Sequence, residues 1–346
     1  MGFTPLQILW YFLIFLLIAG YFALDGFDLG IGSLYPFITK DDREKAICRR
    51  VIGPVWDGNE VWLLTAGGAL FAAFAPAYAT TFSGFYLAIM LVLFGLIVRA
   101  VSLEFRAHEE KFTRLWDTLF FVGSLLPALL LGVAVGNVYA GVPLNEVGDY
   151  VGVPLLGLIT PFTLLCGLLG CSMMLTAGCA WLALKSPKRC ELRARAQRCR
   201  RVLLIVDLVL FCCLSLYGHF LIQPDMDPAL AILRFSCAGG FLVCLGACLA
   251  LGREGHNDLA VFFAQALAAI LLVFLCAFTM FPNLVVAAAG SVGPSIDIAT
   301  AASSDATLSA MTVIASIGVP IVIAYHVFAY HAFRGRLTDE EVEKLE

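Results

Sequence analysis

The sequence predicts an all-α integral membrane protein with nine transmembrane helices, organised as two four-helix units and a ninth helix. Of its 346 residues, 61% are hydrophobic and 14% are charged, and the mean hydropathy is +0.91. These values exclude an ordinary soluble domain. Apolar runs of about 20 residues, long enough to cross the hydrocarbon core, recur along the chain, and basic residues fill only every second loop between them.

Each apolar run is expected to form one transmembrane helix. In chain order, the spans are expected at 8–35, 51–74, 79–104, 116–138, 157–184, 202–222, 228–250, 259–281 and 307–332. The short-period alternation and turn signals of a membrane β-barrel are missing, so we expect a helical bundle.

The distribution of Lys and Arg predicts the orientation in the membrane. The basic loops hold Lys40, Arg43, Lys45, Arg49 and Arg50; Arg106, Lys111 and Arg114; the run 185–201; Arg253; and Arg334, Arg336 and Lys344. The intervening loops, near 75–78, 139–156, 223–227 and 282–306, contain neither Lys nor Arg. By the positive-inside rule the N-terminus lies outside and the C-terminus in the cytoplasm. Residues 1–9 carry no basic group, so we expect the first helix to be retained rather than cleaved.

The basic run 185–201 divides the chain into similar halves. We expect a first four-helix unit at 1–156, a second with an outside loop at 157–306, and a ninth helix with a cytoplasmic tail at 307–346. The outside loop 282–306, rich in Ala, Ser and Gly, is expected to be a flexible connector. The twelve cysteines are expected to be helix-packing residues rather than disulfide partners.

Charged residues within the first three spans are the strongest functional signal. They are Asp25, Asp28, Asp57, Glu60, Arg99 and Glu104. Each ionised group in hydrocarbon costs about 2.5–3.5 kcal/mol, and the predicted topology places all six at a similar depth on the cytoplasmic side. Asp25 and Asp28 are three residues apart and share a helix face, as do Asp57 and Glu60. This pattern indicates an ion or proton path.

Five acids against one arginine cannot all be ionised in a dry site. We therefore expect at least one of Asp25, Asp28, Asp57 and Glu60 to be protonated at neutral pH. The alternative is a buried polar network that only joins helices. Other polar residues are weaker signals: Asp207 is expected to face the basic loop, and none of the five histidines is expected to bind haem.

The same segments resemble subunit II of the cytochrome bd ubiquinol oxidases. The most specific matches are DGFDLGIG at 25–32 and WDGNEVWL at 56–63. Further matches occur at 65–73, 82–86, 132–137, 141–143, 280–282 and 333–336. The likeness runs from the first span to the last.

This resemblance implies a fold of two four-helix bundles plus one peripheral helix, in the bacterial inner (cytoplasmic) membrane. It also implies a subunit of a terminal quinol:oxygen oxidoreductase of the respiratory chain. The partner, subunit I, would carry two b-type haems, the d-type haem and the quinol site, so this chain would supply no catalytic, cofactor-binding or metal-binding residue. The resemblance does not decide whether this chain binds a structural quinone or whether a small single-helix accessory subunit joins the complex. It implies no binding of nucleic acid.

The resemblance also implies a role for the acids. Protons for water formation would come from the cytoplasm, so that the reaction builds membrane potential without pumping. The family's acids fall on Asp28 and Asp57, with Asp25 and Glu104 as further candidates and Arg99 as their charge partner. Two positions depart from the family pattern. Glu60 stands where some members have Gln, and Glu104 stands where some members have Asp. The loop 223–227 is also shorter than in members that carry a long insertion there.

Two other functions stay open on the residues alone. A proton-coupled secondary transporter would also have two halves and intramembrane acids, but its polar site would lie at the midplane rather than toward one leaflet. A scaffold would use the acids only to hold helices together.

Overall fold

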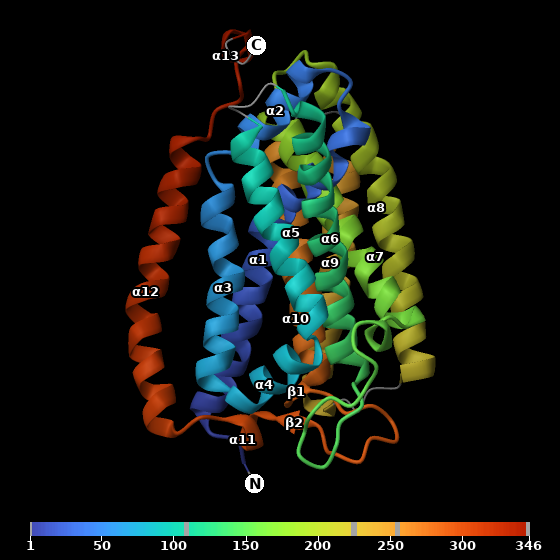
Figure 1. Ribbon diagram of the computed structural model, residues 1–346, viewed down its shortest axis with the longest axis vertical. Coiled ribbons are helices and arrows are strands. Elements are labelled where there is room, and N and C mark those ends of the chain that lie inside the picture. Colours follow the sequence, from blue (N-terminus) through green and yellow to red (C-terminus); the bar gives the residue numbers. More distant parts are fainter. Residues whose placement is uncertain (1, 107–110, 223–226, 253–256, 344–346) are drawn as a thin grey trace.

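The computed structural model of the protein is a bundle of long helices with the chain termini at opposite ends (Figure 1). It describes residues 2–106, 111–222, 227–252 and 257–343. Arg253, Lys344 and most of the loop 223–227, all used in the sequence analysis, lie outside these residues.

Thirteen helices and two short strands are assigned within the described residues. The helices are α1 Pro5–Ile38, α2 Asp42–Ile52, α3 Trp56–Ala73, α4 Ala75–Gly84, α5 Tyr86–Phe105, α6 Thr113–Ala140, α7 Pro161–Lys185, α8 Glu191–Tyr217, α9 Ala231–Leu251, α10 Asp258–Met280, α11 Ile298–Ala301, α12 Asp305–Ala332 and α13 Asp339–Glu343. The strands β1 Asn283–Val285 and β2 Ile296–Asp297 pair antiparallel. Short helical turns cover Leu156–Leu158, Gly218–Ile222 and Pro228–Leu230.

Eight stretches of the described chain are long and apolar enough to cross a membrane. The expected span 51–74 is not among them, because α3 begins only at Trp56 and its first turns carry Asp57, Asn59 and Glu60. The expected span 79–104 is divided at Phe85, where α4 ends and α5 begins. Here α4 turns across the lower end of the bundle (Figure 1).

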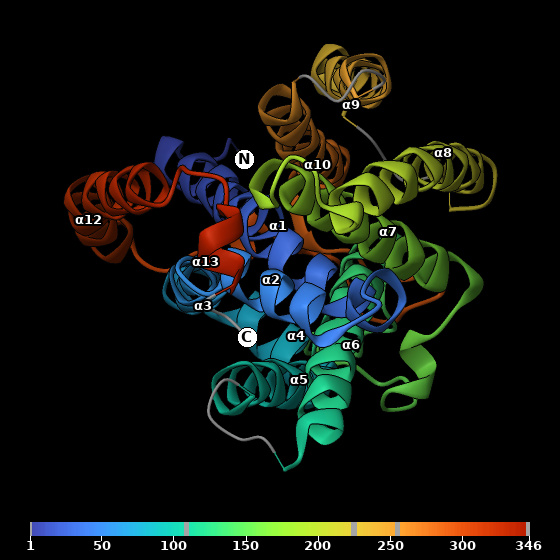
Figure 2. The same ribbon diagram turned by 90° about the horizontal axis from the view of Figure 1, so that it is seen from above.

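Helix α1 lies at the centre of the bundle, surrounded by α3, α6, α7 and α10 (Figure 2). Every residue from 25 to 35 is buried, so this part of α1 packs on all sides rather than along one stripe. Any side chain here must find its partners inside the protein. Helix α12, by contrast, stands at the edge of the bundle beside α1 and α3 (Figure 2).

Two glycines allow α1 and α7 to cross at close range. A Cβ atom on Gly30 would lie 1.9 Å from the carbonyl oxygen of Met174, and one on Gly178 would lie 2.7 Å from the backbone nitrogen of Ile31. Close backbone approach through small residues is a common means of packing membrane helices. The crossing fixes the half of α1 that carries Asp25 and Asp28.

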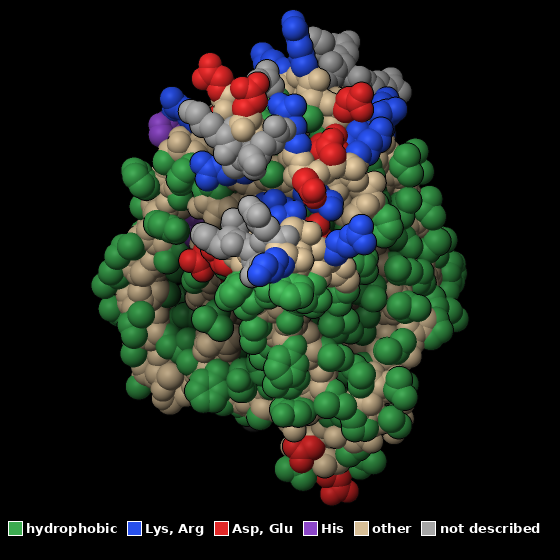
Figure 3. Space-filling view, turned by 45° about the horizontal axis from the view of Figure 1, so that its top comes forward, with side chains coloured by type: hydrophobic (Ala, Val, Ile, Leu, Met, Phe, Trp, Pro, Cys, Tyr) green, Lys and Arg blue, Asp and Glu red, His purple; other side chains and the backbone are tan. Residues whose placement is uncertain are grey.

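On the face shown in Figure 3, basic side chains gather at the end of the bundle that holds the C-terminus, and hydrophobic side chains cover the middle. At this end the carboxylate of Asp117 accepts from Tyr35 Oη (3.0 Å), Lys45 Nζ (2.9 Å) and Arg106 Nε (3.1 Å). Burial opposes the charge on Lys45, but the hydrogen bond and charge of Asp117 outweigh it and raise the pKa of Lys45 above its ordinary value.

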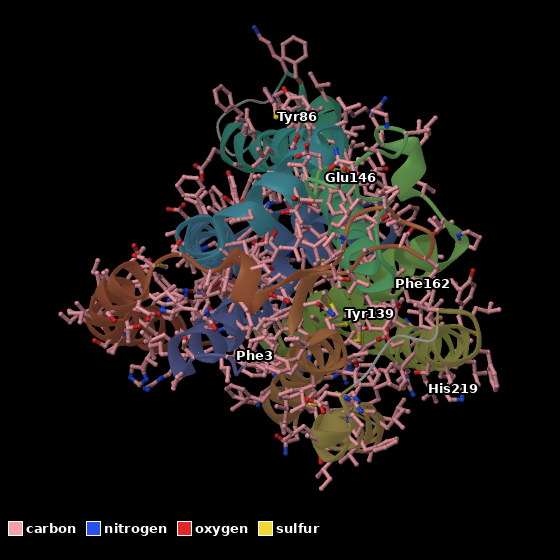
Figure 4. All side chains as sticks on the ribbon, turned by 90° about the horizontal axis from the view of Figure 1, so that it is seen from below. Phe3, Tyr86, Tyr139, Glu146, Phe162 and His219 are labelled. Atoms are coloured by element: carbon pink, nitrogen blue, oxygen red, sulfur yellow. The ribbon has the colours of Figure 1, made fainter. Side chains whose placement is uncertain are left out.

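The segment 282–306 is ordered, so its interpretation as a flexible connector was wrong. It forms β1, β2 and α11, and it pairs with the loop that follows α6: Val142 N donates to Val286 O (3.0 Å) and Ala288 N to Val142 O (2.9 Å). Side-chain spacing carries no signal for such backbone bonds. Figure 4 views this end from below, with Glu146 on the loop that follows α6.

Replacing Gly30 with alanine should destabilise the protein. The added methyl group would meet the backbone of α7, and overpacking of this kind costs about 1–3 kcal/mol. The unfolding temperature in detergent measures the loss. Gly68→Ala is the matched control, because nothing lies within 4 Å of a Cβ there; equal losses in the two variants would contradict the role of the crossing.

Candidate functional site: a buried arginine–carboxylate network

Four of the six predicted charged residues meet inside the bundle. Asp25 and Asp28 come from α1, Glu60 from α3 and Arg99 from α5. Asp25 and Asp28 are fully buried, Arg99 is 2% exposed, and the Glu60 side chain is 27% exposed. Asp25 and Asp28 share one face of α1 because they are three residues apart.

Arg99 is the shared cation of this network. Its Nη2 atom donates to Asp25 Oδ1 at 3.0 Å and also to Glu60 Oε1. The guanidinium carbon lies 6.0 Å from the centre of the Trp56 ring, within reach of a cation–π interaction. Its Nε and Nη1 atoms and Asp25 Oδ2 are buried without a hydrogen-bond partner among the described residues. The network therefore keeps unused donor and acceptor capacity.

Asp28 is held by neutral groups. Asn59 Nδ2 donates to Asp28 Oδ2 at 2.7 Å and to the carbonyl oxygen of Leu24 at 3.3 Å. The Asn59 side-chain oxygen in turn accepts from Tyr330 Oη at 3.0 Å, which connects α12 to the site. Asp28 Oδ1 is buried and has no hydrogen-bond partner among the described residues, so one oxygen of this carboxyl is left available.

Asp57 and Glu104 do not join the buried network. Both are exposed. Glu104 follows Arg99 by five residues, which on a helix is about 7.5 Å further along the axis and about 140° around it. Asp57 lies one turn before Glu60 on α3, and both side chains line a largely apolar cavity of about 1080 Å³ between the helices. Glu60 thus touches both the cavity and Arg99.

Sequence reasoning missed the roles of three residues, of which Asn59 and Asp207 are buried and Tyr330 is partly buried. Asn59 lies inside the 56–63 motif but was not singled out, and Tyr330 gave no pattern signal. Asp207 was expected to face the basic loop, and this expectation was wrong. The structure buries Asp207 completely, and its Oδ2 accepts from Thr176 Oγ1 at 2.7 Å.

The buried histidine of the described residues offers no unengaged ring nitrogen to a haem iron. This histidine, His326, has both ring nitrogens engaged: Nδ1 lies 2.9 Å from Val322 O, and Nε2 lies 3.2 Å from Trp62 Nε1. No group of three or more His, Cys, Asp or Glu residues is placed to hold a metal ion within the described ranges. His108 and His256 lie outside them.

These features define a polytopic helical membrane protein with a charged network inside its bundle. Comparison with known proteins identifies the family. The family model for cytochrome bd terminal oxidase subunit II matches residues 6–333, and the chain belongs to this family.

Two relatives and one solved structure agree with this assignment. The chain is 36% identical to cytochrome bd-I ubiquinol oxidase subunit 2 of Escherichia coli K12, over 98% of this chain and 97% of the relative. It is 32% identical to cytochrome bd ubiquinol oxidase subunit 2 of Bacillus subtilis 168, over 98% of both. Its fold matches a chain of the bd oxidase from Geobacillus thermodenitrificans with a TM-score of 0.76, at 15% identity over 95% of this chain and 99% of that one. The protein is therefore a subunit of a terminal oxidase.

Replacing Arg99 with glutamine should lower the free energy of unfolding by about 3–5 kcal/mol, because it leaves buried carboxylates without their cation. Adding Asp25→Asn and Glu60→Gln to the same chain should recover part of the loss. Denaturant unfolding in detergent measures both. The control is Lys40→Gln, whose exposed ion pair with Glu191 spans 3.8 Å and should contribute about 0–1 kcal/mol. A similar loss in the two single variants would show that Arg99 is not the buried counter-charge.

Proposed function

We propose that this chain provides part of the route by which protons reach the oxygen-reducing haems of a partner subunit from the cytoplasm. The observation that carries this proposal is Asp28, a fully buried carboxyl with one oxygen unpartnered beside the Arg99 network. Intramembrane acids in a bundle interior commonly mark proton relays. The names of the relatives place such subunits in ubiquinol oxidases.

The charge balance of the network supports a proton on at least one acid. Asp25 and Glu60 share the single guanidinium of Arg99, whereas Asp28 is bonded only to the neutral amide of Asn59. One cation does not compensate three carboxylates in a medium of low dielectric constant, where an unpaired ion is costly. A carboxyl group that holds a proton at neutral pH can release it to a neighbouring water.

In this proposal the acids occupy two zones. Asp57 and Glu104 are the exposed groups and collect protons, while Asp25, Asp28 and Glu60 are the inner carriers. Glu60 connects the zones, because it lines the same cavity as Asp57 and is bonded to Arg99. Arg99 keeps the inner acids in place and balances the charge of those that are ionised.

The proposed complex follows the family. Subunit I would carry two b-type haems, the d-type haem and the quinol site, and proton uptake from the cytoplasm would make the reaction electrogenic without pumping. We propose nine membrane crossings as two four-helix bundles and one peripheral helix, with the N-terminus outside and the C-terminus in the cytoplasm of a bacterium. Chain segments 1–156, 157–306 and 307–346 correspond to these parts. The basic end of the molecule supports this orientation (Figure 3).

Replacing Asp28 with asparagine should reduce quinol oxidase turnover at least tenfold, because a positioned proton carrier contributes about 10²–10⁴ to such rates. The amide keeps the shape and can still accept from Asn59, so haem content and assembly should be retained. Turnover and the reduced-minus-oxidised spectrum of the purified complex measure both quantities.

Asp207→Asn is the matched control, since it neutralises another fully buried carboxyl and should leave turnover unchanged. A scaffold role would give the opposite pattern for Asp28→Asn: lost haem or assembly, with normal turnover in the complex that remains.

Purifying the chain from its host in mild detergent should bring down a larger membrane partner with a d-type haem band in the reduced-minus-oxidised spectrum. A colourless preparation without a partner, from a haem-competent host, would contradict the oxidase assignment of this chain and favour a proton-coupled transporter.

A further inference from the structure

A cavity of about 170 Å³ lies at the basic end of the molecule, and Tyr330, which bonds Asn59 beside the carboxylate network, is in its lining. Arg50 and Pro54, around the turn between α2 and α3, form one wall, and Trp181 and Lys185, at the end of α7, form another. Tyr330 of α12 and the tail that follows this helix complete it.

The tail is fastened across this cavity by specific bonds. Leu337 N donates to Lys185 O at 2.9 Å, and Arg336 Nη1 donates to Ala183 O at 2.9 Å. Arg336 Nη2 also pairs with Asp258 Oδ2 at 2.9 Å. Val342 of α13 is 1% exposed. These contacts hold the tail against the end of α7.

The lining holds more positive than negative charge. Its basic members are Arg50, Lys185 and Arg336, and its acid is Glu341. Arg336 pairs with Asp258, whose carboxylate is also paired with Arg193 and Arg200. Oε2 of Glu341 accepts from Thr338 N (2.8 Å) and Thr338 Oγ1 (3.0 Å), a cap at the start of α13.

Lys185 is the anomaly in this lining. Only 8% of it is exposed, yet no ion pair joins it to a carboxylate among the described residues. Its ammonium donates to the carbonyl oxygen of Phe333 at 2.5 Å and lies 4.8 Å from the centre of the Trp181 ring. An ammonium has three donors, so two remain for a ligand. A buried cation is costly unless an anion compensates it.

We propose that this cavity binds a phosphate-bearing anion, with Lys185 as its main contact and Arg50 at its rim. Basic pockets on the cytoplasmic side of membrane proteins suit phosphate headgroups, and a free phosphate has the same chemistry. A water occupies about 30 Å³ in the liquid, so the cavity has room for a group of several heavy atoms. The surplus of cations disfavours hydronium, which argues against the cavity being the mouth of the proposed proton path.

The test uses the intact oxidase complex, stripped of lipid in a neutral detergent. Inorganic phosphate is titrated at constant ionic strength against chloride, and the unfolding temperature is followed. A parallel series uses nanodiscs of phosphatidylcholine with and without phosphatidylglycerol. The wild-type complex should be stabilised, and Lys185→Gln should raise the half-saturating phosphate concentration about tenfold or more, the effect of losing one charged hydrogen bond.

Lys188→Gln is the matched control, because Lys188 is exposed on the same segment and does not line the cavity. Arg50→Gln, at an exposed position, should weaken binding in the same direction and replaces Lys185→Gln if that variant fails to fold. Stabilisation by phosphate identifies a free anion, and stabilisation by phosphatidylglycerol alone identifies a lipid headgroup. No stabilisation by either, or equal stabilisation of all variants, would overturn the site. This result does not depend on the proton path.

Discussion

The structure depends on the neutralisation of charge in the interior of a helix bundle. Arg99 lies on α5, and its guanidinium donates to Asp25 of α1 and Glu60 of α3. It therefore joins three helices. Carboxylates at this depth are costly without that cation. Because the bonds are charge-assisted and directional, they also fix the rotation of the three helices about their axes. The constraint that stabilises the site therefore also aligns its acids.

The position of α1 makes this arrangement possible. The close crossing at Gly30 and Gly178 brings α7 against one side of α1, while α3 and α12 supply Asn59 and Tyr330 on another. Asp28 is thereby enclosed, and one oxygen of its carboxyl is left without a hydrogen-bond partner among the described residues. Family membership gives this geometry its context in a subunit of a terminal oxidase.

The sequence predicted the helical membrane class and the acids within the first three spans, because charge in an apolar span is itself a signal. Arg99 as their charge partner came from the family resemblance, which did not include Glu60, whereas in the structure Arg99 donates to Asp25 and Glu60. The sequence did not separate Glu60, which reaches Arg99, from Asp57, which is exposed, since spacing alone does not reveal the rotation of a helix against its neighbours. The bond between Tyr330 and Asn59 joins residues 271 positions apart, and no local pattern predicts such a contact. The same limit applies to the backbone pairing of the segment 282–306 and to the burial of Asp207.

The most direct test of the central claim is infrared difference spectroscopy of the purified complex at neutral pH. The variants Asp28→Asn, Asp25→Asn and Glu60→Gln serve to assign any carboxyl band to a residue. The account predicts a carboxyl stretching band of a protonated acid that disappears in at least one of these variants. If the band is missing from the wild-type complex at pH 7, all of these acids are ionised there, and the proposed proton-carrying role of the network is wrong.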